Sequence, residues 1–148
     1  MCKNYVYDVT TALFLLGYYC PNGTIADDQY PCPPGSYSGR IDLTSADECD
    51  MCPQGYYCSW GTGNFSSANP PRPCEQGHYC PFQTPSPDRF PCPAGTYSDR
   101  SDLWSADQCT PCPAGEYCLG TYEHLSGHEH MSRYCTYEHI FRYVRSHF

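Results

Sequence analysis

Thirteen cysteines in 148 residues give this chain its clearest capacity for chemistry. Cysteines form disulfides, bind zinc as thiolates or exchange with other disulfides. Their share of the chain is near the ~8–10% that is typical of a disulfide scaffold in a secreted protein. Because disulfides persist in oxidising compartments, the composition predicts an extracellular location, either secreted or as the ectodomain of a surface protein.

The cysteines follow a repeated motif, Cys-Pro-x-Gly-x-Tyr-(Cys or Ser). Its copies start at Cys32, Cys52, Cys74, Cys92 and Cys112, with Glu75 in the proline place of the third copy. A further copy, Gly17-Tyr18-Tyr19-Cys20, has Phe14 where its first cysteine is expected. Shifting the sequence by sixty positions aligns residues 17–58 with 77–118, and 24 of the 42 residue pairs are identical. This self-similarity predicts an array of small modules of about twenty residues each.

Each residue of the motif has a physical role. The proline fixes φ and extends the entry to the module, and the glycine permits a positive φ at the bend. The tyrosine can lay its ring over an adjacent disulfide and leave its hydroxyl in water. We therefore expect bends at Gly35, Gly55, Gly77, Gly95 and Gly115, and rings covering sulfur at Tyr37, Tyr57, Tyr79, Tyr97 and Tyr117.

Regular secondary structure is expected to be sparse. Short two-stranded ribbons should follow each Gly-x-Tyr, joined by turns rich in Pro, Gly, Asn and Asp. Residues 43–49 and their copy 103–109 predict a single helical turn, with Thr44 or Ser45 as its cap. The predicted fold class is a small, disulfide-rich, elongated tandem array of β-ribbon and turn modules. Trp104, which replaces Thr44 in the copy, is expected to serve local packing rather than contact with a partner.

Two disulfides follow from recurrence: Cys32–Cys49 and Cys92–Cys109 share a separation of seventeen residues. For four other cysteines the sequence favours the crossed pairs Cys52–Cys74 and Cys58–Cys80 over the nested pairs Cys52–Cys80 and Cys58–Cys74. The periodicity leaves Cys112 and Cys118 without partners, although Cys135 can satisfy one of them. Cys2 can pair with Cys20, and an odd total leaves at least one thiol unpaired, as expected for a chain cut from a longer array.

Two other arrangements invite a metal or redox interpretation. Cys49-x-x-Cys52 and Cys109-x-x-Cys112 have the spacing of zinc-binding or exchange dithiols, yet they are better explained as disulfide partners of different neighbours. The imidazoles of His124, His128 and His130 could hold a metal on one helical face, but Ser126-Gly127 weakens such a helix. We expect no metal and no cofactor.

Charge excludes one class of partner. Residues 17–120 carry the whole formal net charge of −8, and their few arginines are dispersed. Nucleic-acid binding needs clustered Lys and Arg, so it is not expected. No stretch approaches the ~20 apolar residues of a membrane span. No recurring nucleophile, base and orienting acid supports catalysis, and we do not expect an enzyme.

The chain divides into five expected segments. Residues 1–16 are an unassigned leader or truncated start, 17–58 and 77–118 are repeats, 59–76 form a connecting loop and linking module, and 119–148 form a His- and Tyr-rich tail that is disordered or weakly helical. Asn22-Gly23-Thr24 and Asn64-Phe65-Ser66 are acceptor triplets for N-glycosylation in turn-rich loops.

The run from Cys92-Pro-Ala-Gly-Thr-Tyr-Ser98 through Leu103-x-Ser-Ala-Asp-x-Cys109 to Cys112-Pro-Ala-Gly-Glu-Tyr-Cys118 resembles the ephrin-receptor-like extracellular cysteine-rich repeats. These are similar in style to the modules of tumour-necrosis-factor and growth-factor receptors. The resemblance covers residues 17–118 and implies tandem copies in a large secreted or cell-surface protein.

The expected function is an extracellular spacer or protein-interaction scaffold with an unidentified extracellular protein partner. One alternative is a ligand-binding ectodomain of the tumour-necrosis-factor-receptor kind, contacted through Trp60, Phe65 and Trp104. The other is a metal-binding or redox protein that uses the Cys-x-x-Cys pairs and the histidines.

Overall fold

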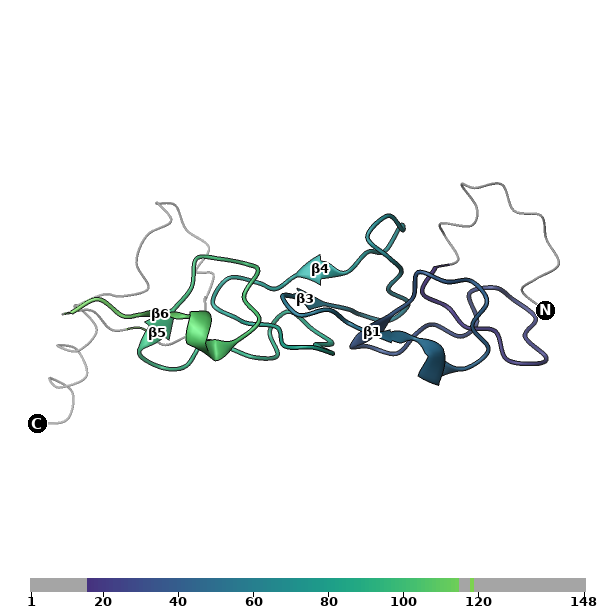
Figure 1. Ribbon diagram of the computed structural model, residues 1–148, viewed down its shortest axis with the longest axis horizontal. Coiled ribbons are helices and arrows are strands. Elements are labelled where there is room, and N and C mark those ends of the chain that lie inside the picture. Colours follow the sequence, from purple (N-terminus) through teal and green to yellow (C-terminus); the bar gives the residue numbers. More distant parts are fainter. Residues whose placement is uncertain (1–15, 115–117, 119–148) are drawn as a thin grey trace, which may run out of the picture.

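The computed structural model describes residues 16–114 and 118, which form an elongated array along one axis (Figure 1). Its elements are β1 (Ser36–Tyr37), η1 (Ala46–Glu48), β2 (Asp50–Met51), β3 (Tyr56–Tyr57), β4 (Arg72–Pro73), β5 (Thr96–Tyr97), η2 (Ala106–Gln108) and β6 (Thr110–Pro111). None of these described elements is an α-helix. The small, disulfide-rich fold with little regular secondary structure is therefore confirmed.

The two-stranded ribbons predicted after each Gly-x-Tyr are present at three of the described motifs. Strands β1 and β2, β3 and β4, and β5 and β6 pair antiparallel as three separate sheets, and each first strand begins directly after a motif glycine. In the first ribbon Ser36 lies opposite Met51 and Tyr37 opposite Asp50. Two isolated bridges, Tyr18 with Pro31 and His78 with Pro91, take the place of a ribbon in the other modules. The chain thus folds back on itself at every motif.

The predicted helical turns are 3₁₀ turns. Ser45 is the N-cap of η1, because its hydroxyl accepts a hydrogen bond from the Asp47 backbone N–H. Ser105 caps η2 in the same way, and the Gln108 side chain returns to the cap backbone to complete a capping box. Of the two proposed caps, Ser45 is therefore the one that is used.

The motif glycines bend the chain with positive φ. The described members of the predicted series have φ angles of 85° at Gly35, 82° at Gly55, 76° at Gly77 and 82° at Gly95. Side chains with a Cβ rarely adopt this conformation, which explains why the motif requires glycine. Gly115 lies outside the described residues.

Successive modules are joined by a recurring pair of backbone hydrogen bonds at these glycines. The glycine carbonyl accepts from the N–H of the first cysteine of the next motif, as in Cys52 N–H to Gly35 at 2.9 Å. The glycine N–H donates to the carbonyl at the seventh position of that next motif, as in Gly35 to Cys58 at 2.8 Å. The same pattern joins Gly55 to Cys74 and Cys80. A motif in this array is therefore completed by the motif that follows it.

The interior is a line of small contacts along the axis. Its fully buried side chains are Leu43, Leu103, Thr62, Thr84, Cys32, Cys52, Cys58, Cys74, Cys80, Cys118 and Ser38. Apart from two leucines, these are sulfur atoms and short polar side chains, so covalent links and backbone hydrogen bonds replace a broad apolar core.

Candidate functional site: module junctions and exposed side chains

The disulfides form two classes. Cys32–Cys49 and Cys92–Cys109 span seventeen residues, as predicted from their recurrence, and hold the capped turn against the motif. Cys52–Cys58, Cys74–Cys80 and Cys112–Cys118 each span six residues and close a single motif. All eight cysteines expected in disulfides are disulfide-bonded.

The crossed pairs Cys52–Cys74 and Cys58–Cys80 are wrong, and so are their nested alternatives. The bend at Gly55 brings the first and seventh residues of its own motif to a Cα–Cα distance of 5.8 Å, which suits a disulfide. The choice between Cys and Ser at the seventh position therefore decides the pairing. Where Ser38 or Ser98 replaces this cysteine, the first cysteine pairs seventeen residues downstream instead.

The expectation that Cys112 and Cys118 lack partners is also wrong, because they pair with each other by the same local closure. Cys20 is disulfide-bonded as well. The proposed partners Cys2 and Cys135 lie outside the described residues.

The Cys-x-x-Cys pairs belong to different disulfides. Cys49 is bound to Cys32 while Cys52 is bound to Cys58, and Cys109 and Cys112 divide in the same way. Their sulfur atoms are therefore not thiolates held ready for zinc or for exchange. Among the described residues, no group of three His, Cys, Asp or Glu side chains could hold a metal. The cluster His124, His128 and His130 lies outside them.

The predicted cover of sulfur by tyrosine is seen at Tyr79. Its half-buried ring packs against the cluster of Cys92, Cys109 and Leu103, and lies 5.6 Å from the Phe90 ring. Tyr37, Tyr57 and Tyr97 are also half-buried, whereas Tyr117 lies outside the described residues. Packing of the ring against a cluster that contains a disulfide is therefore shown for Tyr79.

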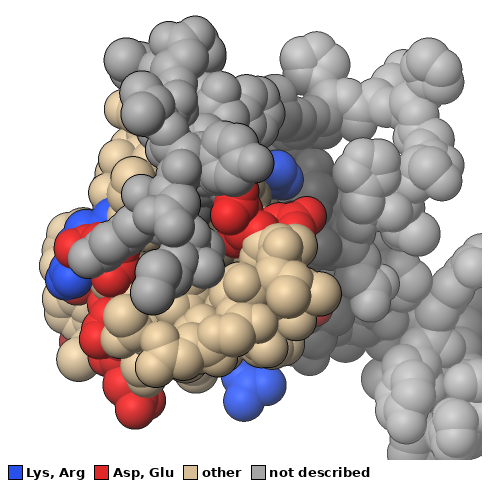
Figure 2. All heavy atoms as spheres, turned by 90° about the vertical axis from the view of Figure 1, so that its right-hand side faces the viewer, with Lys and Arg blue, Asp and Glu red and all other residues tan. Residues whose placement is uncertain are grey.

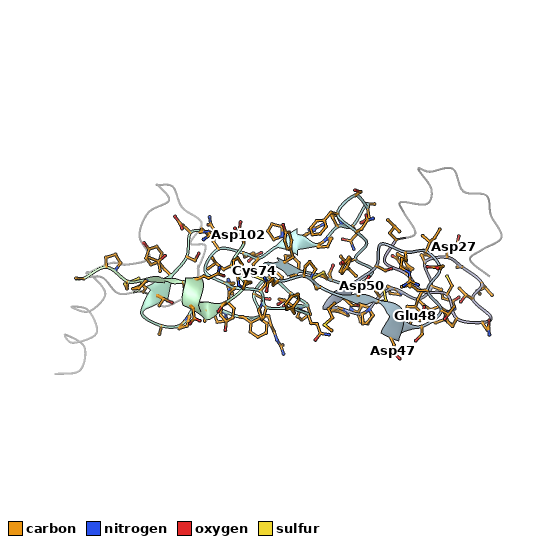
Figure 3. The ribbon with its side chains drawn as sticks, in the orientation of Figure 1. Asp27, Asp47, Glu48, Asp50, Cys74 and Asp102 are labelled. Atoms are coloured by element: carbon orange, nitrogen blue, oxygen red, sulfur yellow. A yellow bond between two sulfur atoms is a disulfide. The ribbon has the colours of Figure 1, made fainter. Side chains whose placement is uncertain are left out.

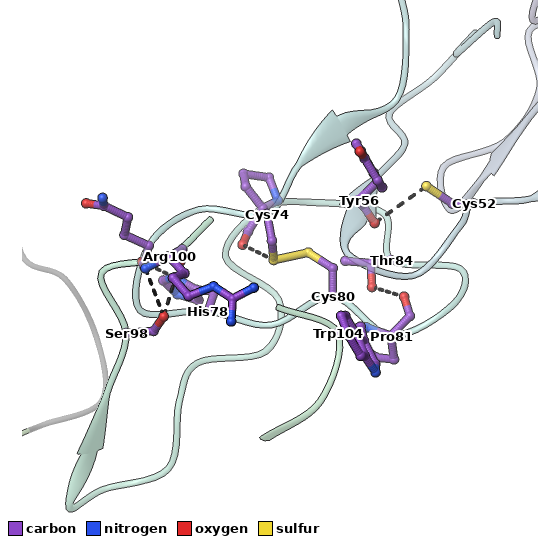
Figure 4. The surroundings of a disulfide bond; sticks show 12 residues. Cys52, Tyr56, Cys74, His78, Cys80, Pro81, Thr84, Ser98, Arg100 and Trp104 are labelled. Carbon is purple, nitrogen blue, oxygen red and sulfur yellow. Dashed lines mark hydrogen bonds between the residues drawn. A yellow bond between two sulfur atoms is a disulfide. The ribbon is translucent and has the colours of Figure 1, made fainter. Parts of the chain in front are cut away.

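The sequence analysis missed a second periodic set, the junction residues Leu43, Thr62, Thr84 and Leu103. Each is almost fully buried. The backbone carbonyl of each accepts a hydrogen bond from the N–H of the seventh residue of a preceding motif, at 2.7–3.0 Å. The pairs, donor first, are Cys20–Leu43, Ser38–Thr62, Cys58–Thr84 and Cys80–Leu103. Thr84 also donates its hydroxyl to the Pro81 carbonyl at 2.7 Å (Figure 4). These four residues are spaced by about twenty residues, as the motifs are, and this spacing could have identified them from the sequence.

The residue before each buried threonine adopts a positive φ. Gly61 has φ of 65° before Thr62, and Gln83 has φ of 64° before Thr84. The Gln83 carbonyl lies against the motif glycine Gly35, where an added Cβ would come within 2.5 Å of it. The glycines thus allow close approach between modules as well as bending.

Large apolar side chains stand exposed along the array: Ile25, Ile41, Met51, Trp60, Phe65, Phe82 and Trp104. Trp60, Phe65 and Trp104, the proposed contact residues of a receptor, are all among them. Trp104 is 44% exposed, so the expectation that it serves local packing holds only for part of its ring. Phe82 was not singled out from the sequence.

Residues 59–71 form a loop with its own internal order. Asn69 donates its side-chain amide to the carbonyls of Trp60 and Gly61, and the Phe65 ring meets Tyr56 edge-on at 5.1 Å. This segment connects β3 to β4 along the chain, and in Figure 1 it projects as a loop beyond β4. Exposed side chains such as Phe65 therefore stand on a loop that also has internal hydrogen bonds and buried residues.

The two glycosylation triplets differ in their surroundings. Asn22 is exposed, while Asn64 is half-buried beside Gly39 and its side-chain oxygen accepts from the Ser66 N–H at 3.0 Å. Asn22 is therefore the more accessible acceptor.

Acidic side chains are distributed along the array. Figure 3 labels Asp27, Asp47, Glu48 and Asp50 in the first repeat and Asp102 in the second. Figure 2 shows acidic and basic groups together on one end of the molecule, beside many uncharged side chains. Residues 16–114 contain four arginines and no lysine, so the part of the chain that the structure describes has no basic cluster.

Two ion pairs occupy matching places in the repeats: Arg40 with Asp42, and Arg100 with Asp102. Arg100 donates two hydrogen bonds to Asp102, and these lower the pKa of that carboxyl and raise the pKa of the guanidinium. A hydrogen bond from the Ser86 side chain lowers the pKa of Asp88. The lowered pKa values favour the ionised forms of Asp88 and Asp102.

The fold and its junctions define a class: a disulfide-linked linear array in which the motifs that begin at Cys32, Cys52, Cys74 and Cys92 are each hydrogen-bonded to the motif that follows. In comparisons with models of protein families and with curated proteins, the chain matches none. Within residues 16–114 and 118, no helix has the length and apolarity needed to span a membrane.

Proposed function

We propose that this chain is an extracellular spacer and protein-interaction scaffold. The observation that carries the proposal is the elongated array, whose interior is filled by disulfides, junction residues and motif glycines (Figure 1). Such an architecture holds its length by covalent links and leaves the side chains between motifs to vary. Its resemblance to ephrin-receptor-like repeats supports a place within a larger secreted or cell-surface protein.

Solution scattering on the oxidised chain tests the rod. A compact globule of this length has a radius of gyration near ~15 Å. We expect a clearly larger radius and a pair-distance distribution with the long tail of a rod. A radius near that of a globule, with a symmetric distribution, would overturn the proposal.

The proposed extracellular location is tested separately by expressing the chain in the secretory pathway. Non-reducing peptide mapping should recover the Cys32–Cys49 and Cys52–Cys58 links, with a glycan at Asn22 more often than at Asn64 because Asn22 is more exposed. Recovery of the chain with its described cysteines reduced would contradict an extracellular role.

A ligand-binding receptor ectodomain of the tumour-necrosis-factor-receptor kind is the second candidate. The exposure of Trp60, Phe65 and Trp104 favours it, since large aromatic side chains are enriched where proteins bind each other. A scaffold and a receptor differ in whether a soluble extracellular ligand binds the isolated chain with 1:1 stoichiometry, which titration calorimetry measures.

A further inference from the structure

The two repeats share one backbone but differ in the side chains at one junction. Cys80 donates its N–H to the Leu103 carbonyl at 2.8 Å, and the matching bond in the first repeat joins Cys20 to Leu43 at 2.7 Å. Two positions after Cys80 stands Phe82, and directly after Leu103 stands Trp104. Sixty residues earlier these places hold Asn22 and Thr44.

The fold does not require aromatic residues at either place. The first repeat forms the same bridge, the same capped turn and the same seventeen-residue disulfide with polar side chains there. Phe82 is nevertheless 61% exposed and Trp104 44% exposed. Two large apolar side chains that the scaffold does not need, both at one junction, are typical of a binding surface rather than of packing.

The hydrogen bond from the Cys80 N–H to the Leu103 carbonyl brings the segments that carry Phe82 and Trp104 to one junction. Pro81 follows Cys80, and in the view of Figure 4 Pro81 and Trp104 overlap, with the Thr84 hydroxyl hydrogen-bonded to the Pro81 carbonyl. Phe82 is the next residue after Pro81. We name the surface formed by Pro81, Phe82 and Trp104 the aromatic junction surface.

The charges around this surface select its partner. Asp102 precedes Leu103, and the exposed Asp107 lies in the turn that follows Trp104. Arg100 is engaged with Asp102 through two hydrogen bonds. A cationic side chain can therefore lie over the indole face and pair with Asp107, whereas a second acidic copy of this chain or an anionic lipid surface would be repelled.

We infer that the aromatic junction surface binds a basic polypeptide segment, in which an aliphatic or aromatic side chain stands next to Lys or Arg. This inference rests on the proposed interaction scaffold and assigns that role to the second repeat. The corresponding place in the first repeat, Asn22, is an acceptor for a glycan. The same position of the scaffold thus carries a glycan that covers the surface in the first repeat and a side chain that contacts the partner in the second.

The probe is a library of displayed random twelve-residue peptides, panned on the oxidised full chain and depleted on a Phe82→Ser/Trp104→Thr variant. Serine is used because Phe82→Asn would create the acceptor triplet Asn-Gln-Thr. Ile41→Ser is the matched control, since it removes an exposed apolar side chain of the first repeat and installs the residue of the second.

We expect enriched peptides with Lys or Arg flanking an apolar residue. For a synthetic peptide of that sequence, either single substitution should weaken binding by about tenfold or more, as hot-spot residues do. The Ile41→Ser chain should bind within about twofold of the parent, and affinity should fall as salt is raised. Selection of uncharged or acidic peptides, or equal binding by the double variant, would overturn the inference.

Two further measurements keep this test separate from that of the scaffold. Scattering and disulfide mapping on each variant show whether the array is intact. An intact rod that selects no basic peptide overturns the inference alone, whereas a compact or differently paired chain overturns the scaffold and the inference together. Sedimentation that shows self-association lost in Phe82→Ser/Trp104→Thr would assign the surface to a second copy and also overturn the inference.

Discussion

Motif glycines join one module to the next through single backbone atoms. Gly35 adopts a positive φ, uses both its N–H and its carbonyl to bind the following motif, and leaves room for the Gln83 carbonyl of a later one. A side chain at this position would therefore disturb three modules. Exposed positions such as 22 and 44 have no such duty, and they differ from their counterparts 82 and 104 in the second repeat.

Alanine substitution at two glycines distinguishes the energetic cost of the positive φ from the cost of filling the space in which two modules approach each other. Gly35 and Gly95 have nearly equal positive φ, but only the Cβ at Gly35 would meet a described backbone atom, the Gln83 carbonyl oxygen. Each substitution should lose about 1–2 kcal/mol of the free energy of unfolding through φ alone. Gly35→Ala should lose a further ~1–3 kcal/mol through overpacking. Calorimetric unfolding of the oxidised variants measures this difference, and equal losses would show that the close approach is unimportant.

The Arg100–Asp102 pair predicts a local pH effect. Because hydrogen bonds from Arg100 lower the folded-state pKa of Asp102 below 3.8, the pair stabilises the fold at neutral pH, and this contribution disappears as the pH falls through the lowered value. Both side chains are more than half exposed, so the effect on overall stability should be small. In an NMR titration, Arg100→Gln should raise the Asp102 midpoint and Arg89→Gln should leave it unchanged. An unchanged midpoint in Arg100→Gln would contradict this cause.

At the level of elements, each ribbon or capped turn is too short to be stable alone. A two-residue strand pair or a single 3₁₀ turn contributes few hydrogen bonds, and isolated hairpins are marginal in water. Here the six-residue disulfides close the motif bends, and the seventeen-residue disulfides hold the capped turns. Covalent links thus supply the stability that longer elements would otherwise provide.

Removing one disulfide of each class tests this division. Chain-entropy arguments give about 3 kcal/mol for a loop of seventeen residues and about 2 kcal/mol for one of six. The double variant Cys92→Ala/Cys109→Ala should therefore unfold at a lower temperature than Cys74→Ala/Cys80→Ala. The reverse order, in calorimetry of chains whose other links are verified by mapping, would show that closure of the motif bend contributes more than its loop length implies.

At the scale of the whole molecule, the array is nearly one-dimensional. Its backbone hydrogen bonds reach only neighbouring or next-neighbouring motifs, so that each junction depends on local partners. Stability should therefore vary along the rod instead of being shared by one core.

Reciprocal leucine substitutions test this locality. Leu103→Ala should cost about 2–5 kcal/mol at its own junction and speed amide exchange at Cys80, whose N–H donates to residue 103. Exchange at Cys20, which donates to Leu43, should hardly change, and Leu43→Ala should give the mirror result. Equal acceleration at both amides in either variant would show that the array unfolds as one cooperative unit.

Sequence alone was sufficient for features set by local chemistry. Cysteine content and the Pro, Gly and Tyr of the motif predicted a disulfide-rich array of ribbons, and recurrence predicted Cys32–Cys49 and Cys92–Cys109. Ser45, one of the two predicted caps, could be identified from the sequence because the side chain of a cap residue hydrogen-bonds within its own turn. Each of these features depends on residues close together in the chain or repeated at a fixed distance.

The choice of partner for Cys52 and Cys58, and the contacts between modules, were decided only by the tertiary structure. Pairing of Cys52 with Cys58 follows from how sharply the bend at Gly55 brings a motif's own ends together, a distance that spacing does not reveal. The burial of Thr62 and Thr84 and the exposure of Phe82 depend on which modules stack against each other. The physical reason is that residue types and their recurrence act along the chain, whereas the sharpness of a bend and the burial of a side chain are set in three dimensions, the burial by modules twenty or more residues away in the sequence.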